Sequence, residues 1–129
     1  MKTVKILLSG ILVCFTMFAQ SQSLSSDISV GLKAGNVKLI SKHFAESVDV
    51  SIFDKSNVYS SSEAEKELSE FFRANPPKDF TPIHAGERTG SSYVIGRLIT
   101  ETGEFRITCY ARKVKENYLI NQLKVERFE

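Results

Sequence analysis

The sequence predicts an α+β domain in which N-terminal helices pack on a bent antiparallel meander sheet. Up to residue 75, apolar residues recur mainly at helical spacing. From residue 80 onward they alternate with polar residues in four runs that are separated by turn-forming dipeptides. Helices that precede a run of strands are typical of the α+β class. We therefore expect residues 22–129 to form one α+β domain, large enough to bury its own core.

Residues 1–21 have the three-part pattern of a secretory signal peptide. Two lysines lie within Met1–Lys5, an apolar run follows over Ile6–Phe18, and small and polar residues occupy Ala19–Ser21. The apolar run is shorter than the ~20 residues that a membrane-spanning helix needs. We expect cleavage before Gln22, or alternatively after Ala19, with export to the periplasm or the cell exterior and no membrane span.

Charge and cysteine content limit the classes of partner. The 17 basic residues include Lys2 and Lys5, so signal removal leaves basic residues in balance with the 15 acidic ones. Phosphate recognition needs clustered Lys and Arg, and a nucleic-acid partner is therefore not expected. Cys14 lies in the signal segment, which leaves Cys109 without a disulfide partner.

Two short helices are expected at the start of the domain. Apolar residues recur at four-residue spacing before Gly35, at Leu24, Ile28 and Leu32. Asn36 can cap a second helix, whose apolar stripe comprises Val37, Ile40 and Phe44. The pair is interpreted as core-forming helices.

A strand and a longer helix follow. Val48, Val50 and Ile52 alternate with polar residues and predict a strand, which Val58-Tyr59 extends after a turn at residues 55–57. Overlapping capping boxes, Ser60-x-x-Glu63 and Ser62-x-x-Glu65, predict the start of a helix. Its apolar stripe comprises Ala64, Leu68, Phe71 and Phe72. Asn75-Pro76-Pro77 ends it, because proline cannot donate a backbone hydrogen bond.

Four strands are predicted at Phe80–Arg88, Tyr93–Glu101, Glu104–Lys113 and Tyr118–Phe128. The turns between them are expected at Thr89-Gly90, Thr102-Gly103 and Glu116-Asn117. The last strand is apolar on both sides, with Leu119, Leu123 and Val125 on one and Tyr118, Ile120 and Phe128 on the other. We therefore expect it to be central or covered.

The turns predict a register that separates two faces of the sheet. A two-residue turn at Thr102-Gly103 pairs Leu98 with Ile107, and the turn at Thr89-Gly90 pairs Ala85 with Val94. The inner face then carries Ile83, Ala85, Val94, Gly96, Leu98, Ile107, Cys109 and Ala111. The outer face carries His84, Tyr93, Ile95, Arg97, Ile99, Thr108 and Tyr110. We expect the helices to pack on the inner face.

Several motifs resemble those of a known superfamily. They are Gly35-Asn36, Tyr59-Ser60, Phe71-Phe72-x-x-Asn75-Pro76-Pro77, Phe80-x-x-x-His84-x-Gly86, Tyr93-x-Ile95-Gly96 and Gly103-x-Phe105-Arg106. With the order of elements, they resemble the nuclear-transport-factor-2-like, or cystatin-like, α+β roll, and within it a small exported bacterial family of unknown function. The resemblance covers the whole domain. It implies the fold but no chemistry, since superfamily relatives include isomerases, dehydratases and non-catalytic binding modules.

No catalytic residue, metal site or cofactor is predicted. An isomerase resembling ketosteroid isomerase would need a carboxylate base and a protonated acid facing its pocket, and the inner face has neither. Asp49 is expected to face solvent, and His43 to be a partly exposed residue at a helix end. Cys109 is expected to be a buried, unreactive thiol.

The candidate binding residues are His84, Arg97 and Tyr110, which share the outer face and could bind an anion or a partner, and Tyr59, which could point into a pocket. Candidate interface residues are Tyr93, Ile95, Ile99 and Tyr110, because large exposed side chains of this kind usually mark an interface. We therefore expect an exported, non-catalytic binding module with a homodimer, an envelope protein or a small ligand as partner. The alternative is a pocket enzyme of the isomerase or lyase type.

Overall fold

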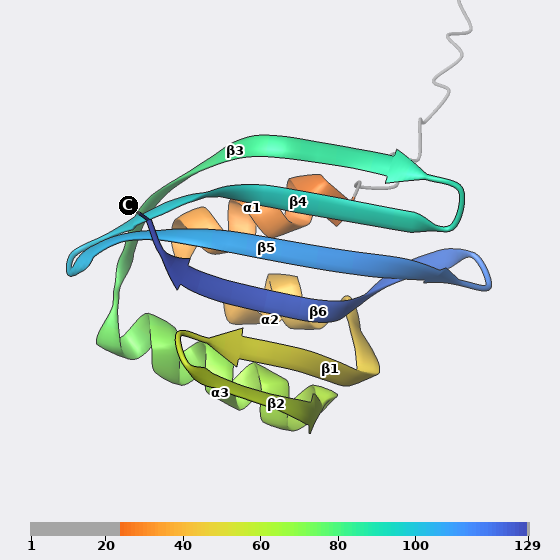
Figure 1. Ribbon diagram of the computed structural model, residues 1–129, viewed down its shortest axis with the longest axis horizontal. Coiled ribbons are helices and arrows are strands. Elements are labelled where there is room, and N and C mark those ends of the chain that lie inside the picture. Colours follow the sequence, from red (N-terminus) through yellow and green to blue (C-terminus); the bar gives the residue numbers. More distant parts are fainter. Residues whose placement is uncertain (1–23, 129) are drawn as a thin grey trace, which may run out of the picture.

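The computed structural model describes residues 24–128, so the predicted signal segment and its cleavage site lie outside the described residues. Three helices cover one face of a six-stranded sheet, and Figure 1 views the sheet from the face that the helices leave open. The helices are α1 (Leu24–Ala34), α2 (Val37–Ser41) and α3 (Ser61–Ala74). The strands are β1 (Phe44–Ile52), β2 (Lys55–Ser60), β3 (Pro77–Arg88), β4 (Ser91–Thr100), β5 (Gly103–Val114) and β6 (Asn117–Arg127). The α+β class is confirmed.

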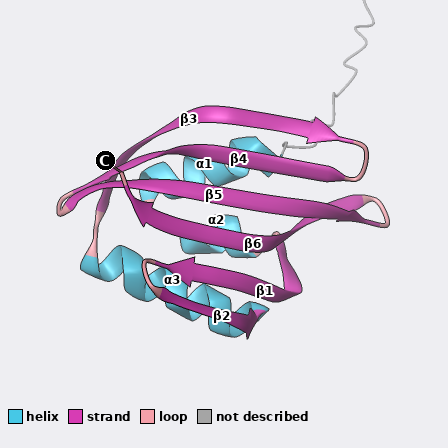
Figure 2. Ribbon diagram, viewed as in Figure 1, coloured by secondary structure: helices cyan, strands magenta, loops and turns pink. Residues whose placement is uncertain are grey.

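The strand order is β2-β1-β6-β5-β4-β3. All neighbours are antiparallel except β1 and β6, which are parallel, so the sheet is mixed rather than the purely antiparallel meander that the sequence predicted. Strand β6 lies in the interior of the sheet, as expected from its apolar character on both sides. Figure 2 shows the sheet as one continuous curved layer.

The helices form where the sequence predicts them. Gly35 adopts a left-handed φ of 69° at the end of α1, and the Asn36 side chain accepts a hydrogen bond from the Leu39 backbone. The capping box of Ser60 and Glu63 is formed at the start of α3. Helix α2 ends at Ser41, earlier than its stripe suggested, so Phe44 instead begins β1.

The turn between β1 and β2 lies at Phe53-Asp54, two residues before its predicted position, because Ile52 pairs directly with Lys55. Phe53 has a left-handed φ of 56°, which two-residue hairpin turns require. An aromatic residue is rare in that conformation, and the sequence therefore gave no turn signal there.

The β4–β5 register differs from the prediction by two residues. Leu98 pairs with Phe105 and not with Ile107, because the turn lies at Glu101-Thr102. The Thr100 hydroxyl fixes this turn: it donates to the Gly103 carbonyl at 2.8 Å and accepts from the Thr102 backbone at 3.1 Å. A shift of two residues preserves the side of every residue, so the predicted faces of these two strands are correct.

Two bulges change which residues face the core. Ile83 is an extra residue in β3, so Pro82 takes its expected place beside Gly96 and Ile83 is exposed. Ala85 pairs with Val94 as predicted, but it is exposed on this edge strand instead of buried. A second bulge lies in β6, where Ala111 pairs with Ile120 and Tyr110 with Gln122. Ile120 therefore joins Leu123 and Val125 in the core, although strict alternation placed it on the opposite side.

The core fills the space between the helices and the inner face. Its members from β4 and β5 are Val94, Leu98, Phe105, Ile107, Cys109 and Ala111, each at most 3% exposed. Helices α1 and α3 supply Ile28, Leu32, Leu68, Phe71 and Phe72. Among the described helices none is long and apolar enough to cross a membrane.

Candidate functional site

The outer face of the sheet carries the predicted interface residues. Tyr93, Ile95 and Ile99 of β4 are partly buried, and Tyr110 of β5 is 41% exposed. Tyr93 pairs with Tyr110, and their rings lie 6.2 Å apart. Burial alternates along β4 and β5, so these four side chains lie on the side of the sheet opposite the buried core. The described helices lie on the core side of the sheet (Figure 1). We call the four side chains the outer patch.

Arg97 extends the outer patch towards the C-terminus. Its guanidinium lies 4.1 Å from the centre of the Phe128 ring, and its Nη1 lies 3.4 Å from Glu104 Oε1. His84 is exposed and pairs with Ile95, so it shares this face. The structure thus places the predicted anion-binding residues on one face, but gives Arg97 a carboxylate and an aromatic ring as neighbours, and gives Tyr110 a second tyrosine.

Tyr59 and Asp49 lie on the first hairpin. The Tyr59 ring packs partly buried against the core, and its hydroxyl is 3.4 Å from the Asn57 amide nitrogen. It does not line the groove described next. Asp49 is exposed, as predicted.

A groove of about 470 Å³ lies between the β1–β2 turn and the C-terminal half of α3. Its lining residues are Ile52, Phe53, Asp54, Lys55, Glu67, Glu70, Phe71, Ala74 and Asn75. A smaller hollow of about 310 Å³ adjoins it and is lined by Phe53, Asp54, Glu126 and Arg127. We call the larger hollow the turn groove. Sequence reasoning missed it, because its central residue, Phe53, carried no signal of a turn.

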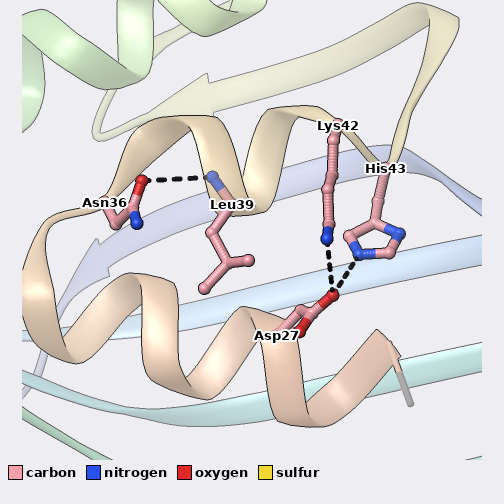
Figure 3. A network of polar contacts seen from close by, with 5 residues as sticks. All are labelled: Asp27, Asn36, Leu39, Lys42 and His43. Atoms are coloured by element: carbon pink, nitrogen blue, oxygen red, sulfur yellow. Dashed lines mark hydrogen bonds and ion pairs between the residues drawn. The ribbon is translucent and has the colours of Figure 1, made fainter. Parts of the chain in front are cut away.

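A buried carboxylate links the first two helices. Asp27 of α1 is 4% exposed, and its Oδ2 lies 2.8 Å from His43 Nε2 and 3.4 Å from Lys42 Nζ (Figure 3). The His43 carbonyl also accepts a hydrogen bond from the Ile120 backbone. His43 is partly exposed just beyond the end of α2, as predicted, but its partner was not. These contacts join α1 to the end of α2 and to strand β6, so we assign Asp27 and His43 a structural role.

Cys109 lies on the inner face and is 1% exposed. Burial raises the pKa of its thiol to about 12, from an ordinary value of 9.0, because the thiolate would lose its hydration. The thiolate is the nucleophile in cysteine chemistry, so this side chain is unsuited to catalysis.

Thiol labelling tests the burial of Cys109. We expect a disulfide reagent at pH 8 to modify the native protein at least ~100-fold more slowly than the protein in denaturant, since the native thiol is both inaccessible and protonated. The release of thionitrobenzoate from Ellman's reagent measures both rates. Equal rates in the two states would show that the inner and outer faces of β5 are exchanged.

Comparison with known proteins identifies relatives over almost the whole described chain. A family model described as a domain of unknown function (DUF4783) matches residues 25–126. A crystal structure of a DUF4783 family protein from Bacteroides uniformis superposes with a TM-score of 0.80 and 31% identity, covering 83% of this chain and 99% of that one. One from Bacteroides fragilis has a TM-score of 0.75 and 35% identity, covering 79% and 96%.

A more distant neighbour shows the fold alone. It is a domain of unknown function with a cystatin-like fold from Nostoc punctiforme, with a TM-score of 0.64, 11% identity, and coverage of 84% of this chain and 75% of that one. No curated protein matches the chain. The order of helices and strands, the cystatin-like neighbour and the family match agree, and the chain belongs to the DUF4783 family, whose function is unknown.

Proposed function

We propose that this protein is an exported, non-catalytic interaction module that docks a partner through the outer patch of its sheet. The observation that carries the proposal is the uncovered position of Tyr93, Ile95, Ile99 and Tyr110. Aromatic residues and arginine are enriched at protein interfaces, and Arg97 and Phe128 border the patch. The signal pattern of residues 1–21 supports export.

The inner face supports a role without catalysis. Acid–base chemistry needs titratable groups that converge on a pocket, whereas the space between helices and sheet is filled by apolar side chains. Cys109 is the ionisable residue of β4 and β5 that faces this core, and its raised pKa of about 12 keeps it neutral. Within the described residues, β4 and β5 present no buried carboxylate or histidine to this core that could act as the base of an isomerase or lyase.

A second copy of the chain is the partner that the outer patch suits best. Arg97 is paired with Glu104, and Lys124 Nζ lies 2.8 Å from Glu126 Oε2. Because Arg97 and Lys124 each have a carboxylate of the same chain beside them, these two charges add little repulsion when two identical faces meet. The aromatic centre of the patch then becomes the buried part of the interface.

Replacing Ile95 with lysine should weaken self-association about tenfold or more without unfolding the domain. A lysine at the centre of an apolar interface loses its hydration on association, whereas in the monomer this partly exposed position tolerates a charge. Sedimentation velocity of the purified protein between about 5 and 200 μM measures the dimerisation constant.

Val30→Lys is the matched control for this experiment. Val30 is 54% exposed on α1, in the helical layer behind the sheet, so the same change there should leave association unaltered. A wild-type protein that stays monomeric at 200 μM would refute self-association. Unfolding of the Ile95→Lys variant would show that Ile95 belongs to the core.

A further inference from the structure

The turn groove has an apolar floor that the fold holds in place. Phe53 is 41% exposed, and its ring lies 6.2 Å from the Phe71 ring and 5.6 Å from the Phe105 ring. Ile52 and Ala74 continue this apolar surface on either side. A hollow of about 470 Å³ lies within the range of small-molecule sites, which are mostly apolar with a few polar groups at fixed positions.

The position of Phe53 is fixed although its backbone is strained. A left-handed φ of 56° costs a bulky residue roughly 1–2 kcal/mol. The Phe53 backbone donates to the Val125 carbonyl at 3.0 Å, and the guanidinium of Arg127 lies 4.9 Å from the centre of its ring. These contacts hold a partly exposed aromatic ring at the groove, so a ligand need not order it on binding.

The rim of the turn groove is acidic. Asp54, Glu67 and Glu70 line it, against a single lysine. Lys55 Nζ lies 3.8 Å from Glu67 Oε1, so these two charges largely offset each other. Neither Asp54 nor Glu70 has an ion pair within residues 24–128, and the three carboxylates outnumber Lys55 and the nearby Arg127. The groove therefore combines an apolar floor with a net negative rim.

We propose that the turn groove binds a small amphipathic amine, whose apolar body lies on Phe53 and Phe71 and whose ammonium group contacts Asp54 and Glu70. A neutral or anionic ligand of the same shape lacks the attraction of the rim. This inference is independent of self-association through the outer patch.

Fluorescence titration with dansylcadaverine tests the proposal. This probe has an apolar aromatic body and a primary ammonium group, and its emission rises when the dansyl group leaves water. We expect saturable binding with a Kd below about 1 mM, and at least ~5-fold weaker binding of the N-acetylated probe, which has the same body without the charge. The affinity of the amine should also fall as salt is raised from 50 to 500 mM.

Two variants locate the site. Asp54→Asn combined with Glu70→Gln should weaken binding of the amine about fivefold and leave the acetylated probe unaffected. The matched control, Glu87→Gln with Glu116→Gln, removes two exposed carboxylates elsewhere and should have little effect. Ala74→Trp fills the groove from the exposed end of α3 and should abolish binding of both probes.

Several results would overturn the proposal. They are the absence of saturable binding up to 1 mM, equal affinity for the charged and acetylated probes, or unchanged binding by the Ala74→Trp variant. All the substituted residues lie in helices, strands or the turns between them and are exposed, so thermal unfolding should confirm that each variant is folded.

Discussion

Replacing Phe105 with alanine should destabilise the domain by about 3–5 kcal/mol. Phe105 is 1% exposed, and its ring lies 5.3 Å from that of Phe71 and 5.6 Å from that of Phe53. Truncation removes the buried surface and leaves a cavity that the strands of a sheet cannot close. Urea unfolding followed by circular dichroism measures the loss of free energy.

Phe105→Leu is the control for that experiment. Leucine keeps much of the volume, so we expect a markedly smaller loss than for alanine. If both variants lost the same free energy, the aromatic cluster would depend on ring stacking and not on filled volume. A loss below about 1 kcal/mol for alanine would contradict the position of Phe105 in the core.

Replacing Gly96 with alanine should destabilise the domain by about 2–3 kcal/mol. A Cβ atom at Gly96 would overlap the Phe80 ring and lie 2.6 Å from the Thr81 carbonyl oxygen. The ring could rotate away, but the carbonyl belongs to the backbone of the paired strand and cannot move without disturbing the β3–β4 ladder. Thermal unfolding should show a fall in Tm of roughly 10–20 °C.

Gly90→Ala separates this steric effect from backbone strain. Gly90 has a φ of 83° in the turn between β3 and β4, and no atom outside its chain neighbours lies within 4 Å of the position that a Cβ would take. Alanine there costs about 1 kcal/mol through its conformation alone. Equal losses at the two positions would show that Gly96 is not in close contact with β3.

Much of the fold could be predicted because local signals and the global structure agree. The capping box of Ser60 and Glu63 begins α3, Gly35 ends α1, and period-two alternation sets the faces of β4 and β5. Predicted pairings such as Leu98 with Ile107 were wrong by two residues, because the hydroxyl of Thr100 forms the turn one residue earlier than the glycine suggested. A hydrogen bond from a side-chain hydroxyl to the backbone of a turn depends on the three-dimensional position of both groups, which the pattern of apolar and polar residues does not specify.

The features near the candidate sites were harder to predict. The bulge at Ile83 inserts a residue into β3, and alternation cannot locate such an insertion. The contact between Asp27 and His43 joins residues sixteen apart across two helices, with no periodic signal. The turn groove depends on Phe53, an aromatic residue in a conformation that glycine or asparagine usually occupies. Ile83, the Asp27–His43 contact and Phe53 do not follow residue periodicity or the usual turn preferences, so a prediction based on those two signals could not find them.

The parallel pairing of β1 with β6 also determines the order in which the molecule can assemble. Phe44 lies beside Ile120 and Ile52 beside Val125, so the first strand, which pairs with β2 on one side, has the last strand as its neighbour on the other side. Closing so long a loop is entropically costly and slows folding. Until the final strand has been synthesised, the hairpin of β1 and β2 has no sheet to join. The chain therefore cannot complete its sheet during synthesis, and it stays incompletely folded until the residues of β6 are available.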